Sequence, residues 1–239
     1  MPSVAVIIPY RGGCPHRQRA LQLVARWWAE RHPEWQLIVA TDGTGVPWRK
    51  AVAVAHGAQE ADADVLVVAD ADLVPFGVGE AVTALGRGEP WVFAFRTAYR
   101  LTESATDALA EAGTPPVESQ LDSYTRHVRY VGKPGGGCVV LPAETWRRVP
   151  MDPRFGGWGH EDLSWALALS ALAGAPWRCT RPAAHLWHPR APRLRADVGS
   201  TENLALWTRY RTAASRPLMA ALVAEARDAL ASMVVPAAS

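Results

Sequence analysis

The sequence has few cysteines and no long apolar run. Its three cysteines, Cys14, Cys138 and Cys179, are far apart along 239 residues. An odd number at such spacing matches neither a disulfide framework nor a zinc motif, and it favours a reducing compartment. No apolar run approaches the about 20 residues that a membrane-spanning helix needs. The chain starts with a strand-like segment instead of a charged segment followed by an apolar one. We therefore predict no signal peptide, no membrane span and a cytoplasmic protein.

A large excess of charge is absent as well, because the formal net charge is +2 at pH 7. This balance permits an anionic nucleotide as ligand, but it does not by itself predict a nucleic-acid binder. With 49% hydrophobic and 20% charged residues, the composition is that of a globular protein whose core needs no disulfide. The unusual feature is the presence of 11 tryptophans. We expect most of them in the core and a few to be available for stacking on sugar rings.

Strand and helix patterns alternate through the first hundred residues. The predicted strands are 3–9, 35–41, 65–69 and 91–96, and the predicted helices are 15–31, 49–60 and 77–85. Right-handed crossovers between such strands give a mostly parallel central sheet flanked by helices. In an α/β fold of this kind, ligands bind beyond the carboxyl ends of the strands.

The second half is less regular. We interpret residues 102–129 as an irregular excursion that walls an acceptor site. A strand at 138–141, a helix at 161–173, an extended segment at 177–184 and helices from 201 to about 233 follow. The predicted organisation is one domain, 1–214, with a nucleotide-binding half (1–100) and an acceptor-binding and catalytic half (101–214). Residues 215–239 form a C-terminal helical extension.

Two carboxylates, Asp70 and Asp72, follow the third predicted strand. Where a strand runs out into a loop, one carboxylate can bind a divalent ion while the other meets a ribose or a metal-bound water. Carboxylate oxygens suit Mg²⁺ or Mn²⁺, and an added imidazole favours Mn²⁺. A solvated turn explains an isolated Asp-Ala-Asp about as well.

A second acidic pair, Glu161-Asp162, opens a predicted helix behind the loop Gly156-Gly157-Trp158-Gly159. The positive end of a helix favours ionised carboxylates, so we expect both to be deprotonated near neutral pH, as a general base requires. Helix capping alone also explains acidic residues here. It does not explain the glycine-rich loop, which allows a ligand to come close.

His185 and His188 flank Trp187. On an extended chain this spacing places the two imidazoles on opposite sides, so the pattern favours one metal ligand over two. A lone histidine is more often structural than a ligand.

Together these motifs resemble a known family. The segments concerned are Ile7-Ile8-Pro9-Tyr10-Arg11, Asp70 to Pro75, Gly135-Gly136-Gly137 and Trp158 to Asp162. In this order they are similar to family 2 type glycosyltransferases of the GT-A fold. The C-terminal half resembles β-1,4-galactosyltransferases and chondroitin-polymerase domains. The resemblance covers about residues 3–210.

The resemblance implies roles for individual residues. On the donor side, Asp72 would bind the metal with His185, His188 being the alternative, and Asp70 would contact ribose or metal-bound water. The nucleotide pocket would be lined by Pro9, Tyr10 and Arg11, with Asp42 near the uracil. On the acceptor side, Asp162 would be the catalytic base, Glu161 would hold a sugar, and Trp158 would lie on a loop that closes over the donor.

The implied activity is an inverting, Mn²⁺- or Mg²⁺-dependent transfer from a UDP-sugar to an acceptor hydroxyl. Retaining relatives usually carry Asn at the position of Asp162. The acceptor could be a glycan, a small metabolite, a protein or modified DNA, the last if Arg190, Arg193 and Arg195 form a basic stripe. The chain departs from the family pattern at Thr44, which is usually serine, at His56, where asparagine is common, and at His160, which replaces a glycine.

Two other classes stay open at this point. A nucleotidyltransferase can share the sheet and carboxylates, and Gly12-Gly13 with Arg17 and Arg19 faintly suggests its phosphate loop. A nucleotidyltransferase function does not explain the cluster from Trp158 to Asp162. A noncatalytic sugar-binding module would use the tryptophans alone.

Overall fold

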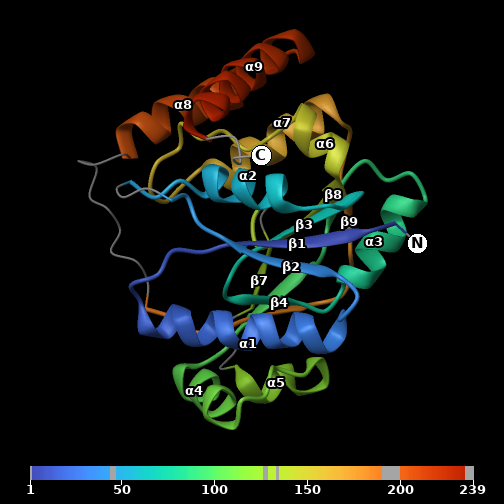
Figure 1. Ribbon diagram of the computed structural model, residues 1–239, viewed down its shortest axis with the longest axis vertical. Coiled ribbons are helices and arrows are strands. Elements are labelled where there is room, and N and C mark those ends of the chain that lie inside the picture. Colours follow the sequence, from blue (N-terminus) through green and yellow to red (C-terminus); the bar gives the residue numbers. More distant parts are fainter. Residues whose placement is uncertain (1, 44–46, 126–128, 133–134, 190–199, 235–239) are drawn as a thin grey trace.

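β1 (Val4–Pro9) is buried along its whole length, as its β-branched sequence predicts. The computed structural model describes residues 2–43, 47–125, 129–132, 135–189 and 200–234. In it, β1 belongs to a six-stranded sheet of order β2-β1-β3-β8-β5-β9 (Figure 1). The other strands are β2 (Gln36–Ala40), β3 (Val65–Ala69), β8 (Cys138–Pro142), β5 (Val92–Phe93) and β9 (Trp177–Arg178). β8 runs against β3 and β5, while the remaining pairs are parallel. The fold is thus α/β with a mostly parallel central sheet, as predicted.

A second sheet was not predicted. It has the order β4-β10-β6-β7, with strands β4 (Leu73–Pro75), β10 (Ala183–His185), β6 (Thr97–Arg100) and β7 (Arg129–Val131). Strands of three or four residues are too short for an alternating pattern to stand out in the sequence. The predicted strand 177–184 therefore divides into β9 and β10, which belong to different sheets, and the predicted strand 91–96 is shorter, as β5.

Helices cover both faces of the central sheet (Figure 1). α1 (Pro15–Arg31) and α2 (Lys50–Glu60) match the predicted helices closely, with Pro15 in the first turn of α1. The other helices are α3 (Val78–Gly86), α6 (Ala143–Arg148), α7 (Glu161–Leu172), α8 (Ser200–Thr212) and α9 (Arg216–Met233). α8 and α9 pack on α7, and α9 also reaches α2.

Residues 102–129 are more regular than the sequence indicates. They contain α4 (Glu103–Ala112), a 3-10 turn (Glu118–Gln120) and α5 (Leu121–Tyr124). The Thr102 hydroxyl caps α4 by accepting the Ala105 N–H, and Gly113 ends it in the left-handed conformation. With only Thr106 and Leu109 buried, α4 lacks the broad apolar stripe by which helices are found.

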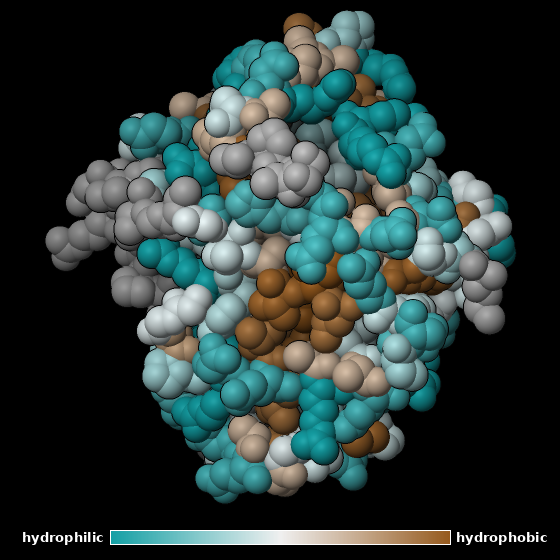
Figure 2. Space-filling model, viewed as in Figure 1, coloured by the Kyte–Doolittle hydropathy of each residue, from teal (hydrophilic) through white to brown (hydrophobic). Residues whose placement is uncertain are grey.

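Five of the eleven tryptophans are buried in the core, and three more are partly buried against it. Trp28, Trp91 and Trp165 are almost fully buried, whereas Trp158 is 76% exposed. Figure 2 shows hydrophobic surface over β2, the edge strand that exposes Val39. No helix in the described part of the chain combines the length and apolar character needed to cross a membrane.

Candidate active site

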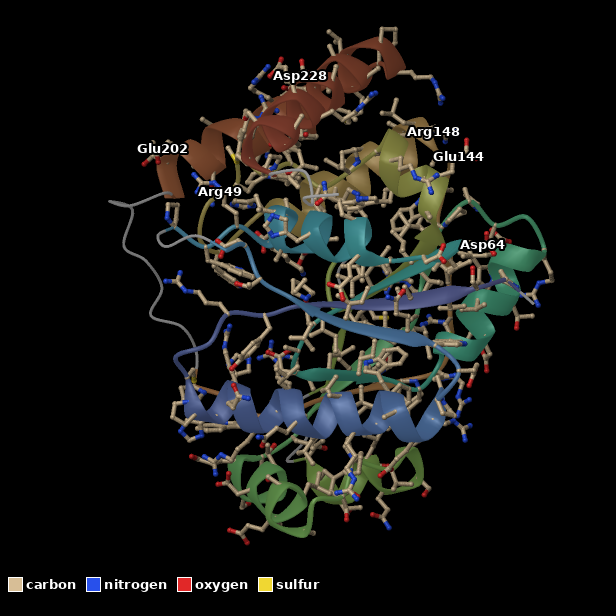
Figure 3. All side chains as sticks on the ribbon, in the orientation of Figure 1. Arg49, Asp64, Glu144, Arg148, Glu202 and Asp228 are labelled. Carbon is tan, nitrogen blue, oxygen red and sulfur yellow. The ribbon has the colours of Figure 1, made fainter. Side chains whose placement is uncertain are left out.

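The functional side chains gather where β1, β2 and β3 end. Figure 3 labels Arg49 at this edge, just before α2, and Asp64 at the opposite edge, where its carboxylate accepts the Ser3 N–H at 3.0 Å. α2 leads the chain from the edge where β2 ends back to the opposite edge, where β3 begins. Tyr10, Asp42 and Asp70 therefore follow three neighbouring strands at one edge, as predicted from the strand order.

Asp72, His185 and His188 form one cluster. One candidate ligand atom from each lies within 4.8 Å of the others. His188 Nε2 is 3.0 Å from Asp72 Oδ2, and His185 Nε2 is 3.8 Å from Asp72 Oδ1. All three side chains are mostly buried, with 13–23% of their surface exposed. The expectation that the histidines point to opposite sides is wrong, because both imidazoles lie beside the Asp72 carboxylate.

Main-chain contacts produce this cluster. β10 pairs antiparallel with β4, and its register places His185 opposite Leu73, next to Asp72. The Leu186 N–H donates to the Asp72 carbonyl at 2.8 Å. The Trp187 N–H donates to Thr106 Oγ1 in α4 at 2.9 Å, which turns the chain so that His188 returns toward Asp72. The short second sheet therefore joins two motifs that are more than a hundred residues apart.

The electrostatics of the cluster are strongly coupled. Burial opposes charge on Asp72, yet His185 and His188 hold the pKa of its carboxyl well below the ordinary value. Burial lowers the pKa of His185, whereas the hydrogen bond to Asp72 raises the pKa of His188. Arg17 adds a smaller contribution that also lowers the pKa of Asp72.

The cluster fits a divalent transition metal. His188 Nδ1 is 2.9 Å from the Pro189 carbonyl, which can only accept a hydrogen bond. Nδ1 can donate a proton to this carbonyl, while Nε2, which faces Asp72, would give up its own proton to bind a metal, as is usual for a metal-binding histidine. One carboxylate and two imidazoles favour Mn²⁺ over Mg²⁺. Binding by all three side chains stays a prediction.

Asp70 and Asp162 are joined by a residue that the sequence analysis missed. Lys50 Nζ donates to Asp70 Oδ1 at 2.7 Å and to Asp162 Oδ1 at 2.9 Å. Asp70 Oδ2 also accepts the Gly137 N–H at 3.2 Å. Lys50 begins α2, eight residues after Asp42, and a lone lysine at a helix start carries no sequence signal of such a bridge. A single cation thus connects the first and second acidic motifs.

Asp162 is less acidic than its position at a helix start suggests. Burial raises its pKa, Lys50 opposes this effect, and Glu161 and Asp70 add to it, so the pKa lies at about 7. Burial and the two neighbouring acids thus oppose the ionised form that a place at a helix start favours, and the role of Asp162 as a general base stays a prediction. The glycine-rich turn Gly135-Gly136-Gly137, before β8, allows this burial because it packs against the start of α7. A Cβ on Gly135 would lie 1.9 Å from the Asp162 carbonyl oxygen.

The loop before α7 is held by hydrogen bonds at its base. Glu161 Oε2 accepts the Gly159 N–H at 2.8 Å, which places this carboxylate as a cap on its own loop. Asn203 in α8 accepts the Gly156 N–H at 3.2 Å and donates to the Gly156 carbonyl at 2.9 Å. Trp158, between these anchors, projects into solvent. Its proposed closure over a donor stays a prediction.

His160 adopts the conformation of the glycine that it replaces. Its φ is 71°, the one positive value for a non-glycine residue in the described part of the chain. The imidazole stacks on Trp207 of α8, with ring planes 7° apart and centroids 5.4 Å apart. This contact offsets part of the strain and gives the loop a further attachment to α8.

Two of the residues expected to line the nucleotide pocket, Tyr10 and Asp42, already form hydrogen bonds within the protein. Tyr10 follows Pro9 at the end of β1, and its hydroxyl donates to Gln18 at 2.8 Å, while Arg11 is exposed. Asp42 is buried and accepts the Arg49 N–H at 3.0 Å. Their contacts with a nucleotide stay predictions.

The features that suggested a nucleotidyltransferase have other contacts. Arg19 pairs with Asp107 at 3.0 Å and lies 3.0 Å from His16 Nδ1. The Gly12-Gly13 segment leads into α1, where the Cys14 carbonyl accepts the Gln18 N–H at 3.0 Å. Arg19 is therefore engaged with α4 instead of a phosphate loop.

Comparisons with known proteins agree on the fold. No protein-family model and no curated protein sequence matches this chain. The catalytic domain of Drosophila β1,4-galactosyltransferase 7, in complex with xylobiose, is similar with a TM-score of 0.54 and 15% identity, over 91% of this chain and 84% of that chain. Glucosyl-3-phosphoglycerate synthase from Mycobacterium tuberculosis, in complex with Mn²⁺, UDP-glucose and phosphoglyceric acid, has a TM-score of 0.52 and 15% identity, over 88% and 80%. At this level of identity the likeness concerns the fold, and the chain has the GT-A fold.

Proposed function

We propose that this protein is an inverting, metal-dependent glycosyltransferase that moves a sugar from a UDP-sugar donor to an acceptor hydroxyl. The observation that carries the proposal is the convergence of Asp72, His185 and His188 at the ligand edge of a GT-A fold. The similar synthase binds Mn²⁺ and UDP-glucose, which supports the same donor chemistry here.

The donor half of the site consists of acidic and basic groups at one edge. Asp72 and the two histidines would hold Mn²⁺, or Mg²⁺, which when bound neutralises charge on the donor diphosphate. Asp70 lies two residues from the cluster, where it can meet the ribose. Arg11 is exposed and can contact a phosphate, Tyr10 precedes it at the end of β1, and Asp42 follows the neighbouring strand β2.

The acceptor half centres on Asp162. Its carboxylate removes the proton from the acceptor hydroxyl as that oxygen bonds to the anomeric carbon. The bond from this carbon to the diphosphate breaks in the same displacement, so the configuration inverts. Glu161 holds the loop beneath Trp158, whose exposed ring can stack on a sugar face.

We infer that the acceptor is a glycan or a small hydroxylated metabolite. Complexes of the two similar proteins contain xylobiose and phosphoglyceric acid. A modified DNA acceptor would depend on a basic stripe of Arg190, Arg193 and Arg195, which lie outside the described residues. The +2 net charge gives DNA no support.

The first test is UDP binding by calorimetry with Mn²⁺ present and after chelation, with GDP and TDP for comparison. We expect metal-dependent binding that is selective for UDP. Asp72→Ala should lose it, whereas Asp162→Asn should keep it and lose transfer by about 100- to 10,000-fold. Absence of nucleoside-diphosphate binding under every condition would remove the transferase proposal. UDP release from a UDP-sugar separates the enzyme from a noncatalytic sugar-binding module.

A further inference from the structure

Lys50 is the point where the two halves of the site meet. Its ammonium bridges Asp70, which follows β3, and Asp162, in the first turn of α7. The lysine side chain is 13% exposed, while the two carboxylates are 34% and 28% exposed. The cation is therefore largely withdrawn from water, and each acid retains a face that a ligand can reach.

The choice of lysine is informative in this chain. The sequence contains 25 basic residues, yet Lys50 and Lys133 are its only lysines, and Lys133 lies outside the described residues. An ammonium is a compact charge that can donate in several directions, whereas a guanidinium is a larger planar group that needs more space, even where it bridges two carboxylates as Arg154 does between Asp152 and Glu225. Two carboxylates that approach from separate segments match the geometry of an ammonium.

The surrounding charges keep Lys50 positive. Burial alone would lower its pKa, but Asp162, Asp70 and Glu161 raise it well above the ordinary value. Among the described residues, these three acids, from α7 and from the end of β3, are the charged groups that act on its pKa. The same cation opposes the effect of burial on Asp162.

We propose, on the basis of the transferase function above, that Lys50 is a positioning residue for the transfer step. Its ammonium fixes the carboxylate of Asp162 for proton removal and ties it to the donor-side carboxylate of Asp70. Lys50 acts through these two acids and does not itself exchange a proton with the substrate. The bridge fixes the position of Asp162 relative to Asp70, although one carboxylate belongs to α7 and the other follows β3.

Lys50→Met tests the proposal, since it removes the charge and keeps most of the side-chain length. Arg26→Met is the matched control, because Arg26 is exposed and forms an ion pair with Glu30 on the face of α1. The readouts are Mn²⁺-dependent UDP affinity by calorimetry and the pH profile of UDP release from UDP-glucose and UDP-galactose. For Lys50→Met we expect UDP affinity within about threefold of the parent. We expect kcat to fall between about 10- and 100-fold and the acid limb of the profile to move up by about 1–3 pH units.

Lys50→Arg keeps the test valid if Lys50→Met does not fold. It retains the charge, so its acid limb should stay near that of the parent, while kcat should fall because the larger planar guanidinium would displace the carboxylates of Asp70 and Asp162 from their places around the buried ammonium. A Lys50→Met protein with the parent kcat and pH profile would overturn the proposal, as would a Lys50→Arg protein with the parent kcat. Loss of UDP affinity as complete as in Asp72→Ala would make Lys50 a donor ligand instead. A parent protein without UDP binding or turnover would defeat the proposed function itself.

Discussion

Asp162 illustrates how a single carboxyl group is governed by its neighbours. Its place in the first turn of α7 favours the ionised form, but burial under the glycine-rich turn and the nearby Glu161 disfavour it. The positive charge of Lys50 lowers the pKa of Asp162 and so offsets part of this effect, which leaves the pKa at about 7. A base is most effective when its pKa lies near the working pH.

A pH dependence of turnover follows from this value. Asp162 must be ionised to accept a proton, so kcat/KM for UDP release should rise up to about tenfold per pH unit below about pH 6 and level off above about pH 8. Initial rates from about pH 5.5 to about pH 8.5, at saturating Mn²⁺, measure the curve. A flat profile over this range would mean that Asp162 does not titrate in the reaction.

The backbone at His160 leads to a second prediction at this scale. His160→Gly and His160→Ala both remove the ring that stacks on Trp207, but only the glycine is free of strain at φ 71°. We expect His160→Gly to be more stable than His160→Ala by about 1 kcal/mol, as measured by urea denaturation. Equal stabilities would show that the loop relaxes out of the left-handed conformation when the ring is lost.

Among the elements, α8 has a role beyond packing, because it anchors the loop that precedes α7. Asn203 is buried and satisfies both the N–H and the carbonyl of Gly156, while Trp207 stacks on His160 one turn farther along α8. The exposed Trp158 thus lies on a loop whose base is fixed from a helix distant in sequence. The position of α8 therefore determines where Trp158 can meet a ligand.

Asn203→Ala should release this loop. The change leaves the polar groups of Gly156 without their partner, so we expect a loss of about 1–3 kcal/mol of stability. We also expect kcat to fall while Mn²⁺-dependent UDP affinity is retained, because the metal cluster lies on other elements. Thr208→Ala, at an exposed position of the same helix, is the control. A proportional loss of UDP affinity would indicate a general collapse instead.

At the scale of the whole molecule, α9 is part of the core. Its residues Met219, Leu222 and Val223 are buried against α7 and α2. Beside this contact, the Tyr210 hydroxyl donates to the buried Asp152 at 2.9 Å, and Arg154 binds the same carboxylate. These contacts connect the C-terminal helices to the segment that leads into the loop before α7.

A chain that ends at residue 214 tests the predicted boundary of the extension. Burial of the three apolar side chains of α9 contributes about 5–9 kcal/mol, which is comparable to the total stability of a typical domain. We therefore expect the shortened chain to be unfolded or insoluble at 25 °C, judged by circular dichroism and size-exclusion chromatography. A folded 1–214 protein that binds UDP would establish residues 215–239 as a separable extension.

Local patterns were sufficient for much of this protein. The run of β-branched residues in β1, Pro15 in the first turn of α1 and Ser215-Arg216-Pro217 at the start of α9 predict where these elements begin, because each signal lies within a few residues of its element. The alternation of strands and helices also predicts that Asp70 and Asp42 share an edge, since parallel strands all end on the same side.

Only the tertiary structure could decide how the motifs meet. His188 joins Asp72 because β10 pairs with β4 and Thr106 captures the Trp187 N–H, and these contacts link segments distant in sequence. The Lys50 bridge has the same origin. The pKa of Asp162 also depends on burial, which no local pattern encodes. Short-range sterics and hydrogen bonding therefore determined the elements and their order, whereas long-range pairing and desolvation determined the site.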